Sequence, residues 1–243
     1  MLRRLLLAAL AVCGSVSLAA SASIEPKSLE EVVQAYVRAV GGMAAVDRIA
    51  TRQVIAKRHR GAKLDYFWQK PDKVLLVDGK KKLGYDGGSG WMLSQKKRVT
   101  KLSKGSELPL EMDANPLRYV HLKQLYPDVQ ASRAEVLEGE KMDVLTAPNE
   151  LGSTKFYFDE KTHVLARVED RGEMSAYFVH TTQFSDYREV DGVKLPFRIV
   201  HTSTEPGGGE EDLQISKVMQ NIPLQSDMFR KPTGGSVVLG GKR

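Results

Sequence analysis

Five histidines are the side chains of this sequence best suited to acid–base or metal chemistry, namely His59, His121, His163, His180 and His201. None of them lies in an HExxH motif or beside a cysteine. His180 and His201 fall on neighbouring predicted strands and could approach each other, but the sequence identifies no carboxylate partner, and a zinc site needs three or four ligands. The pattern therefore predicts hydrogen-bonded or solvated histidines and no metal site.

The sequence also contains no motif that is typical of a catalytic nucleophile or a phosphate-binding loop. The loop Gly87-Gly88-Ser89-Gly90 lacks the GK[ST] ending of a phosphate loop, and Ser89 lies in no GxSxG motif. Acidic residues are scattered, so no general acid and base pair stands out. We expect no catalytic residue, no cofactor and no enzyme activity. A close cluster of His180, His201 and a carboxylate would favour an enzyme instead.

The first 22 residues have the pattern of an export signal. Met1–Arg4 is basic, Leu5–Val12 is apolar and Ala20-Ser21-Ala22 is a small-residue cleavage site. Lipid anchoring through Cys13 is the competing hypothesis, although Val12 is large for the position before a lipidated cysteine. Cleavage after Ala22 removes Cys13, the only cysteine, so we expect a periplasmic protein that is stabilised by its core and not by disulfides.

Basic residues form two short runs, Lys80–Lys82 and Lys96–Arg98, in a chain of formal net charge +6. Removal of Arg3 and Arg4 with the signal lowers this charge to +4. Exposed strand ends explain such runs, and transient contact with anionic lipid headgroups is the functional alternative. Nucleic acid is not an expected partner, because the chain has no motif that binds it.

Alternating apolar and polar residues, broken by turn signals, predict an antiparallel sheet of about ten strands. Ser28 and Glu31 form a capping box for an amphipathic helix that Gly41-Gly42 ends, with a second helical turn over Met43–Ile49. Helical spacing recurs from Asn115-Pro116 to Pro127, between two strand-rich halves. We expect one domain over residues 23–230 and a loosely held, glycine-rich tail over 231–243.

Asp191-Gly192 is a hairpin dipeptide. A two-residue turn with perfect pairing would place Phe184 opposite Ile199, but also Arg188 opposite Leu195, and so would turn charges toward the apolar side. The sequence therefore predicts a bulge near Ser185 or a longer turn.

The apolar strand faces would line one concave surface that two short helices cover only in part. The predicted wall consists of Leu64, Tyr66, Trp68, Leu76, Phe156, Phe158, Phe197 and Ile199, and the covering helix face consists of Val33, Tyr36 and Val37. Side chains could fill this space as ordinary core. The other hypothesis is an apolar cavity of several hundred Å³ that holds a lipid chain, to which each buried methylene contributes about 0.8 kcal/mol.

Two stretches resemble the periplasmic LolA/LolB-like superfamily, which includes outer-membrane lipoprotein carrier and sorting proteins. They run from Phe158 to Arg167 (FDEKTHVLAR) and from Asp186 to Phe197 (DYREVDGVKLPF), and His163 stands where related sequences often have glycine. The resemblance implies an incomplete, strongly curved antiparallel barrel, with helices over an apolar cavity that holds acyl chains. It therefore implies a non-enzymatic carrier of lipid or acylated protein. The alternative is an envelope interaction or sensor module with a filled interior.

Overall fold

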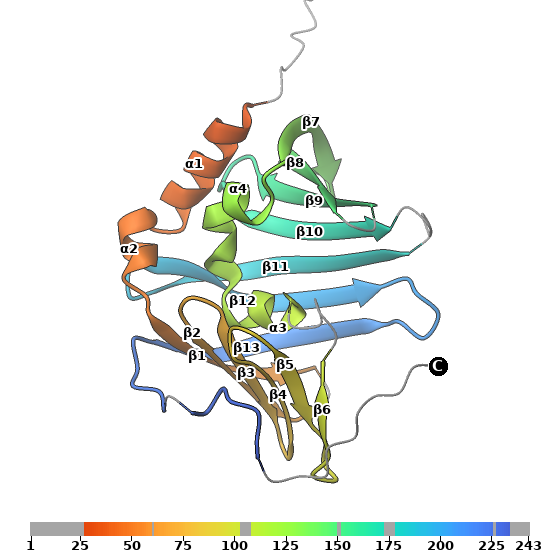
Figure 1. The fold of residues 1–243 in the computed structure, drawn as a ribbon. Coiled ribbons are helices and arrows are strands. Elements are labelled where there is room, and N and C mark those ends of the chain that lie inside the picture. The colour runs from red at the N-terminus through yellow and green to blue at the C-terminus, as the bar shows by residue number, and fades with distance from the viewer. Residues whose placement is uncertain are drawn as a thin grey trace, which may run out of the picture.

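The computed structural model describes residues 27–59, 61–102, 108–149, 152–172, 178–225 and 227–233. The expected export signal, Cys13 and most of the expected tail lie outside these ranges. Within them, no helix is long and apolar enough to cross a bilayer. The fold is mainly β, as the sequence predicts, and its strands form one antiparallel sheet (Figure 1).

The sheet has thirteen strands, more than the ten expected, arranged as two meanders. The first comprises β1 (Thr51–Arg58), β2 (Lys63–Gln69), β3 (Lys73–Asp78), β4 (Lys81–Tyr85), β5 (Gly90–Leu93) and β6 (Val99–Lys101). The second comprises β7 (Gln130–Leu137), β8 (Glu140–Asn149), β9 (Gly152–Asp159), β10 (Leu165–Gly172), β11 (Val179–Val190), β12 (Val193–Ser203) and β13 (Glu210–Gln220). The order runs from β6 back to β1, then from β13 back to β7, so the first and last strands pair at the centre.

The connection between the meanders forms a roof over the sheet. Because β6 and β7 are the two outermost strands, the chain between them must cross the whole face of the sheet. It does so as α3 (Leu108–Ala114), the 3₁₀ helix η1 (Pro116–His121) and α4 (Leu122–Leu125), which lie in front of the strands in Figure 1. The helical spacing before Pro127 predicts the last two, whereas α3 was not expected.

Helix α1 (Leu29–Ala39) begins with the predicted capping box, in which Ser28 and Glu31 satisfy each other's backbone amides. It is followed by α2 (Met43–Asp47), as expected. The buried face of α1 packs on the sheet through Tyr36, whose ring centroid lies 5.2 Å from that of Phe158. Val33 and Val37 are partly buried against the same core, so aromatic and aliphatic side chains fill the space beneath this helix.

The β11–β12 hairpin has a two-residue turn at Asp191-Gly192, so the predicted longer turn and the predicted bulge near Ser185 are both wrong. Pairing stays in perfect register, with Phe184 opposite Ile199 and Arg188 opposite Leu195. The irregularity falls at Asp186, which has a φ of +54° and is missing from the ladder. Arg188 remains exposed at the surface, with its guanidinium 4.5 Å from the centroid of Phe197, so the charge is stacked on an apolar ring and is not buried.

His163 lies in the turn between β9 and β10 with a φ of +59°. This left-handed conformation favours glycine, which agrees with the glycine that the resemblance implies at this position. The backbone amide of His163 donates to the carbonyl of Asp159 over 2.8 Å, and the Asp159 carboxylate accepts from the amides of Lys161 and Thr162. The turn is thus held by hydrogen bonds that do not involve the imidazole.

Candidate ligand-binding site

A pocket with a volume of about 1010 Å³ lies between the roof and the sheet. Its apolar lining comes from β2, β3 and β10, from the roof helices and from the segment that precedes β11. The lining residues of this kind are Tyr66, Leu76, Leu110, Met112, Tyr119, Tyr126, Val168 and Phe178. Pockets of this size bind small organic ligands and are usually lined by apolar side chains with a few polar groups.

The polar groups of the pocket centre on His201 of β12. Its Nε2 lies 2.8 Å from Asp113 Oδ1 on α3, and its Nδ1 lies 3.0 Å from Thr182 Oγ1 on β11. Burial lowers the pKa of His201, but the adjacent Asp113 carboxylate and the more distant Glu211 carboxylate together raise this pKa above its ordinary value. Burial, together with a hydrogen bond to the same carboxylate, raises the pKa of Tyr66. Asp113 therefore joins the roof to two strands of the sheet.

Hydroxyl, imidazole and carboxylate follow one another here in the order that is used for nucleophilic catalysis. Thr182 is only 6% exposed, and its hydroxyl belongs to a stiff β-branched side chain. Both ring nitrogens of His201 are engaged by neighbours, which fixes the orientation of the ring. The His201–Asp113 pair can hold a proton, and the Thr182 hydroxyl keeps the capacity to form a further hydrogen bond to a ligand in the pocket.

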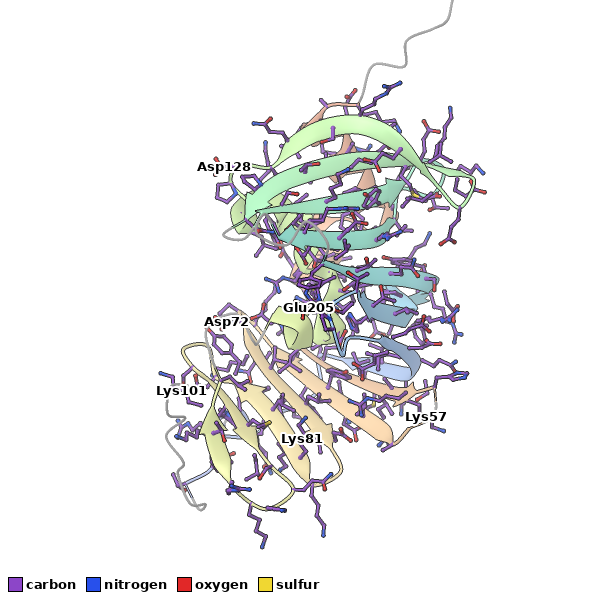
Figure 2. The ribbon with its side chains drawn as sticks, turned by 90° about the vertical axis from the view of Figure 1, so that its right-hand side faces the viewer. Lys57, Asp72, Lys81, Lys101, Asp128 and Glu205 are labelled. Carbon is purple, nitrogen blue, oxygen red and sulfur yellow. The ribbon has the colours of Figure 1, made fainter. Side chains whose placement is uncertain are left out.

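A second polar group lies where β8, β9 and β10 meet the pocket. Asp170 accepts a 2.5 Å hydrogen bond from Thr154 Oγ1, which in turn accepts from Asn149 Nδ2 over 3.1 Å. Burial raises the pKa of Asp170. At the rim, His180 Nε2 lies 3.1 Å from Glu205 Oε1, and Glu205 appears near the middle of the view in Figure 2. Hydrogen bonds and ion pairs thus compensate most of the charges around the pocket.

The two histidines singled out by the sequence both line the pocket, and each has a carboxylate partner that the sequence did not identify. They do not share one ligand set, because His180 pairs with Ser203 in the ladder and Thr182 pairs with His201. Among the described residues, no group of three or more histidine, cysteine or acidic side chains could hold a metal ion.

The predicted wall residues are all buried in the main core, but they do not all border the pocket. Tyr66 and Leu76 line it, and Trp68 lines a smaller pocket of about 330 Å³ next to Arg52. The other five, Leu64, Phe156, Phe158, Phe197 and Ile199, border neither pocket, and the same holds for Val33, Tyr36 and Val37 of α1. The main pocket therefore lies under α3 and η1 and not under α1.

Arg52 of β1 attaches the C-terminal end of α3 to the sheet. It is 1% exposed, and its guanidinium donates to Asn115 Oδ1 over 2.9 Å and to Gln220 Oε1 over 3.0 Å. Burial lowers its pKa to about 10. Asn115, which the sequence suggests as a helix cap, makes no side-chain capping bond and instead accepts from Arg52. One arginine thus links the end of α3 to β1 and β13.

Residues of α3 were missed from the sequence, including Leu110, Met112 and Asp113. A signal was available in Pro109, because proline favours the first turn of a helix. Leu110, Ala114 and Leu117 also follow at i, i+4 and i+7. The pairing of Asp113 with His201 spans 88 positions and leaves no local pattern.

The fold of this chain is similar to that of several solved structures. A putative outer membrane lipoprotein-sorting protein domain from Vibrio parahaemolyticus matches with a TM-score of 0.57 and 16% identity, over 83% of this chain and 95% of that one. A LolA superfamily protein from Nitrosomonas europaea matches with a TM-score of 0.53 and 12% identity, over 84% and 98%. A DUF1329 family protein from Desulfovibrio piger matches with a TM-score of 0.57 and 15% identity, over 83% of this chain and 96% of that one. No family model and no curated protein matches the chain.

The chain therefore has the LolA/LolB-like fold, as the two sequence stretches predict. Sequence identities of 12–16% show a shared fold and not a shared ligand. The function must be argued from the pocket itself.

Proposed function

We propose that this protein is an exported, non-enzymatic carrier that holds the apolar part of a lipid or an acylated protein in the pocket beneath α3 and η1. The observation that carries this proposal is the pocket of about 1010 Å³ whose roof and floor present Leu76, Leu110 and Met112. The expected export signal agrees with this role, because it would place the carrier in the periplasm.

The energetics favour an acyl chain. Each methylene that is moved from water into an apolar site contributes about 0.8 kcal/mol, so several methylenes give useful affinity without any specific polar contact. On one side, the Thr182 hydroxyl, which His201 orients, can hydrogen-bond an ester or amide where the acyl chain joins its polar part. A ligand that is apolar at one end and polar at the other fits both sides of the pocket.

An envelope interaction module with a filled interior is the alternative function. The size of the pocket favours the carrier, because a module that binds through its outer surface does not need an internal space of this volume. The space beneath α1 is filled, but the space beneath the roof is open to a ligand.

The test is lipid extraction and native mass spectrometry of protein purified from the periplasm, with a variant that fills the pocket. Met112 is partly exposed and lines the pocket, so Met112→Trp should occlude it, whereas Met112→Leu keeps the volume and serves as the control. We expect bound lipid in the wild type and in Met112→Leu, and at least a fivefold loss in Met112→Trp. Equal lipid in both variants, or none in the wild type, would contradict the proposal.

The chemical state of the extracted lipid distinguishes a carrier from an enzyme. A carrier returns its lipid intact. If the recovered lipid were hydrolysed by the wild type and intact after Thr182→Val, the Thr182–His201–Asp113 group would be catalytic and the non-enzymatic proposal would be wrong.

A further inference from the structure

Basic residues that are separated in sequence gather at one end of the first meander. Because consecutive strands are antiparallel neighbours, the β1–β2, β3–β4 and β5–β6 connections all lie at the same end of their strands. These connections and their flanks carry Lys57, Lys63, Lys80, Lys96, Lys97 and Arg98, which we call the basic end. Figure 2 shows Lys57 and Lys81 in the lower part of the molecule, away from Asp128.

The charges of the basic end are poorly compensated. All six of its side chains are exposed. The two acidic residues of the same hairpins are already engaged, Asp65 by Lys63 at 3.1 Å and Asp78 by Arg58 at 3.0 Å. Within the described ranges, no ion pair is found for Lys57, Lys80, Lys96, Lys97 or Arg98.

Two lysines of the basic end face each other in the β1–β2 ladder. Lys57 of β1 and Lys63 of β2 are direct partners in the ladder, so two like charges face each other across one hairpin. Like charges in this position are destabilising. The Asp65 carboxylate, 3.1 Å from Lys63 Nζ, offsets part of this repulsion, and an anionic partner near Lys57 would relieve the rest.

We propose that the basic end docks on a bilayer surface that contains anionic lipid headgroups. A planar array of phosphates can meet three neighbouring turn tips at the same time, and each lysine near such a surface strengthens binding by roughly fivefold. Among the described residues the only large apolar side chains that are exposed are Leu125 and Val136, and neither belongs to the basic end. The contact is therefore electrostatic, does not insert into the bilayer and is reversed by salt.

The same features argue against a nucleic acid as the partner. Proteins that bind single strands combine a basic groove with aromatic side chains on which bases stack. The basic end is a row of turn tips, and no exposed aromatic residue is found there among the described residues. The lipid surface also agrees with the proposed carrier function, although docking does not depend on it.

The experiment measures co-sedimentation with phosphatidylcholine vesicles that contain none or 30% of phosphatidylglycerol, from low to high salt. The variant Lys80→Glu/Lys96→Glu/Lys97→Glu reverses three exposed charges of the basic end. The control Lys141→Glu/Lys194→Glu/Lys217→Glu changes the net charge by the same amount at exposed positions elsewhere in the sheet. We expect binding only to anionic vesicles, a loss of about 100-fold or more in the first variant, and a loss of less than fivefold in the control.

Three outcomes would overturn the proposal. They are equal losses in the two variants, wild-type binding that does not depend on phosphatidylglycerol, and binding to heparin or single-stranded RNA without binding to vesicles. Thermal unfolding of each variant verifies that it is folded. Lipid recovered from the pocket of the first variant should match the wild type, which separates a failure of docking from a failure of the carrier function.

Discussion

Nε2 of His201 on β12 lies 2.8 Å from Oδ1 of Asp113 on α3, so an imidazole of the sheet holds the first helix of the roof. The pair sits in the wall of the pocket and not at the surface. Its protonation therefore couples the attachment of the roof to pH.

Removal of the carboxylate should lower the pKa of His201. In Asp113→Asn the desolvation of the imidazole and the weaker attraction of Glu211 remain, while the larger attraction of Asp113 is lost, so the pKa of His201 falls. Titration of the His201 ring protons by NMR measures this change. Glu205→Gln, which alters the neighbour of His180, is the control and should leave the His201 titration unchanged.

Stability should depend on pH through the same residue. The pKa of His201 is higher in the folded protein than in the unfolded chain, so its contribution is fully present below the unfolded value of about 6.5. That contribution is lost as pH rises through the folded pKa. The difference in unfolding free energy between wild type and His201→Asn should thus shrink from pH 5.5 to pH 8. A difference that stays constant, or one that also appears with His59→Asn at an exposed position, would contradict this assignment.

Gly84 of β4 should not tolerate a methyl group. A Cβ at this position would lie 2.5 Å from ring atoms of Trp91, which is 1% exposed and donates its indole N–H to the carbonyl of Phe229 over 2.8 Å. Gly84→Ala should therefore cost about 1–3 kcal/mol and change the tryptophan fluorescence. Gly209→Ala has open space around it and should be close to neutral in the same urea titration.

Phe158 belongs to the filled core and not to the lining of the pocket. It is buried against Tyr36 and does not line the pocket, so Phe158→Ala should cost about 3–5 kcal/mol in urea denaturation. Leu110 faces the open pocket, so Leu110→Ala enlarges an existing space and should cost clearly less. If the two variants lost equal stability, this distinction would be wrong.

Local patterns in the sequence predict much of the fold. The capping box at Ser28, the Asp191-Gly192 turn and the strand alternation are short-range features, and each is present in the structure. The bulge predicted near Ser185 is wrong, because the β11–β12 pairs on both sides of Asp186 keep the same register. Arg188 avoids burial by stacking on Phe197, so no shift of register is needed.

The pocket was harder to predict, because its position depends on contacts between distant segments. Alternation shows that Phe156 and Leu76 point inward, but it does not show that only Leu76 borders the open space. That difference is set by the path of the roof, which follows from the order of all thirteen strands. The Asp113–His201 and Arg52–Asn115 contacts are fixed by the same path.

The pairing of β1 with β13 sets the order in which the molecule can assemble. Arg52 and Gln220 are partners across this ladder, so the middle of the sheet forms only after nearly all of the described chain is present. Such distant pairing slows folding, and until it occurs the inner edges of both meanders stay unpaired. The complete sheet of this topology therefore cannot form before β13, the last strand, has been synthesised.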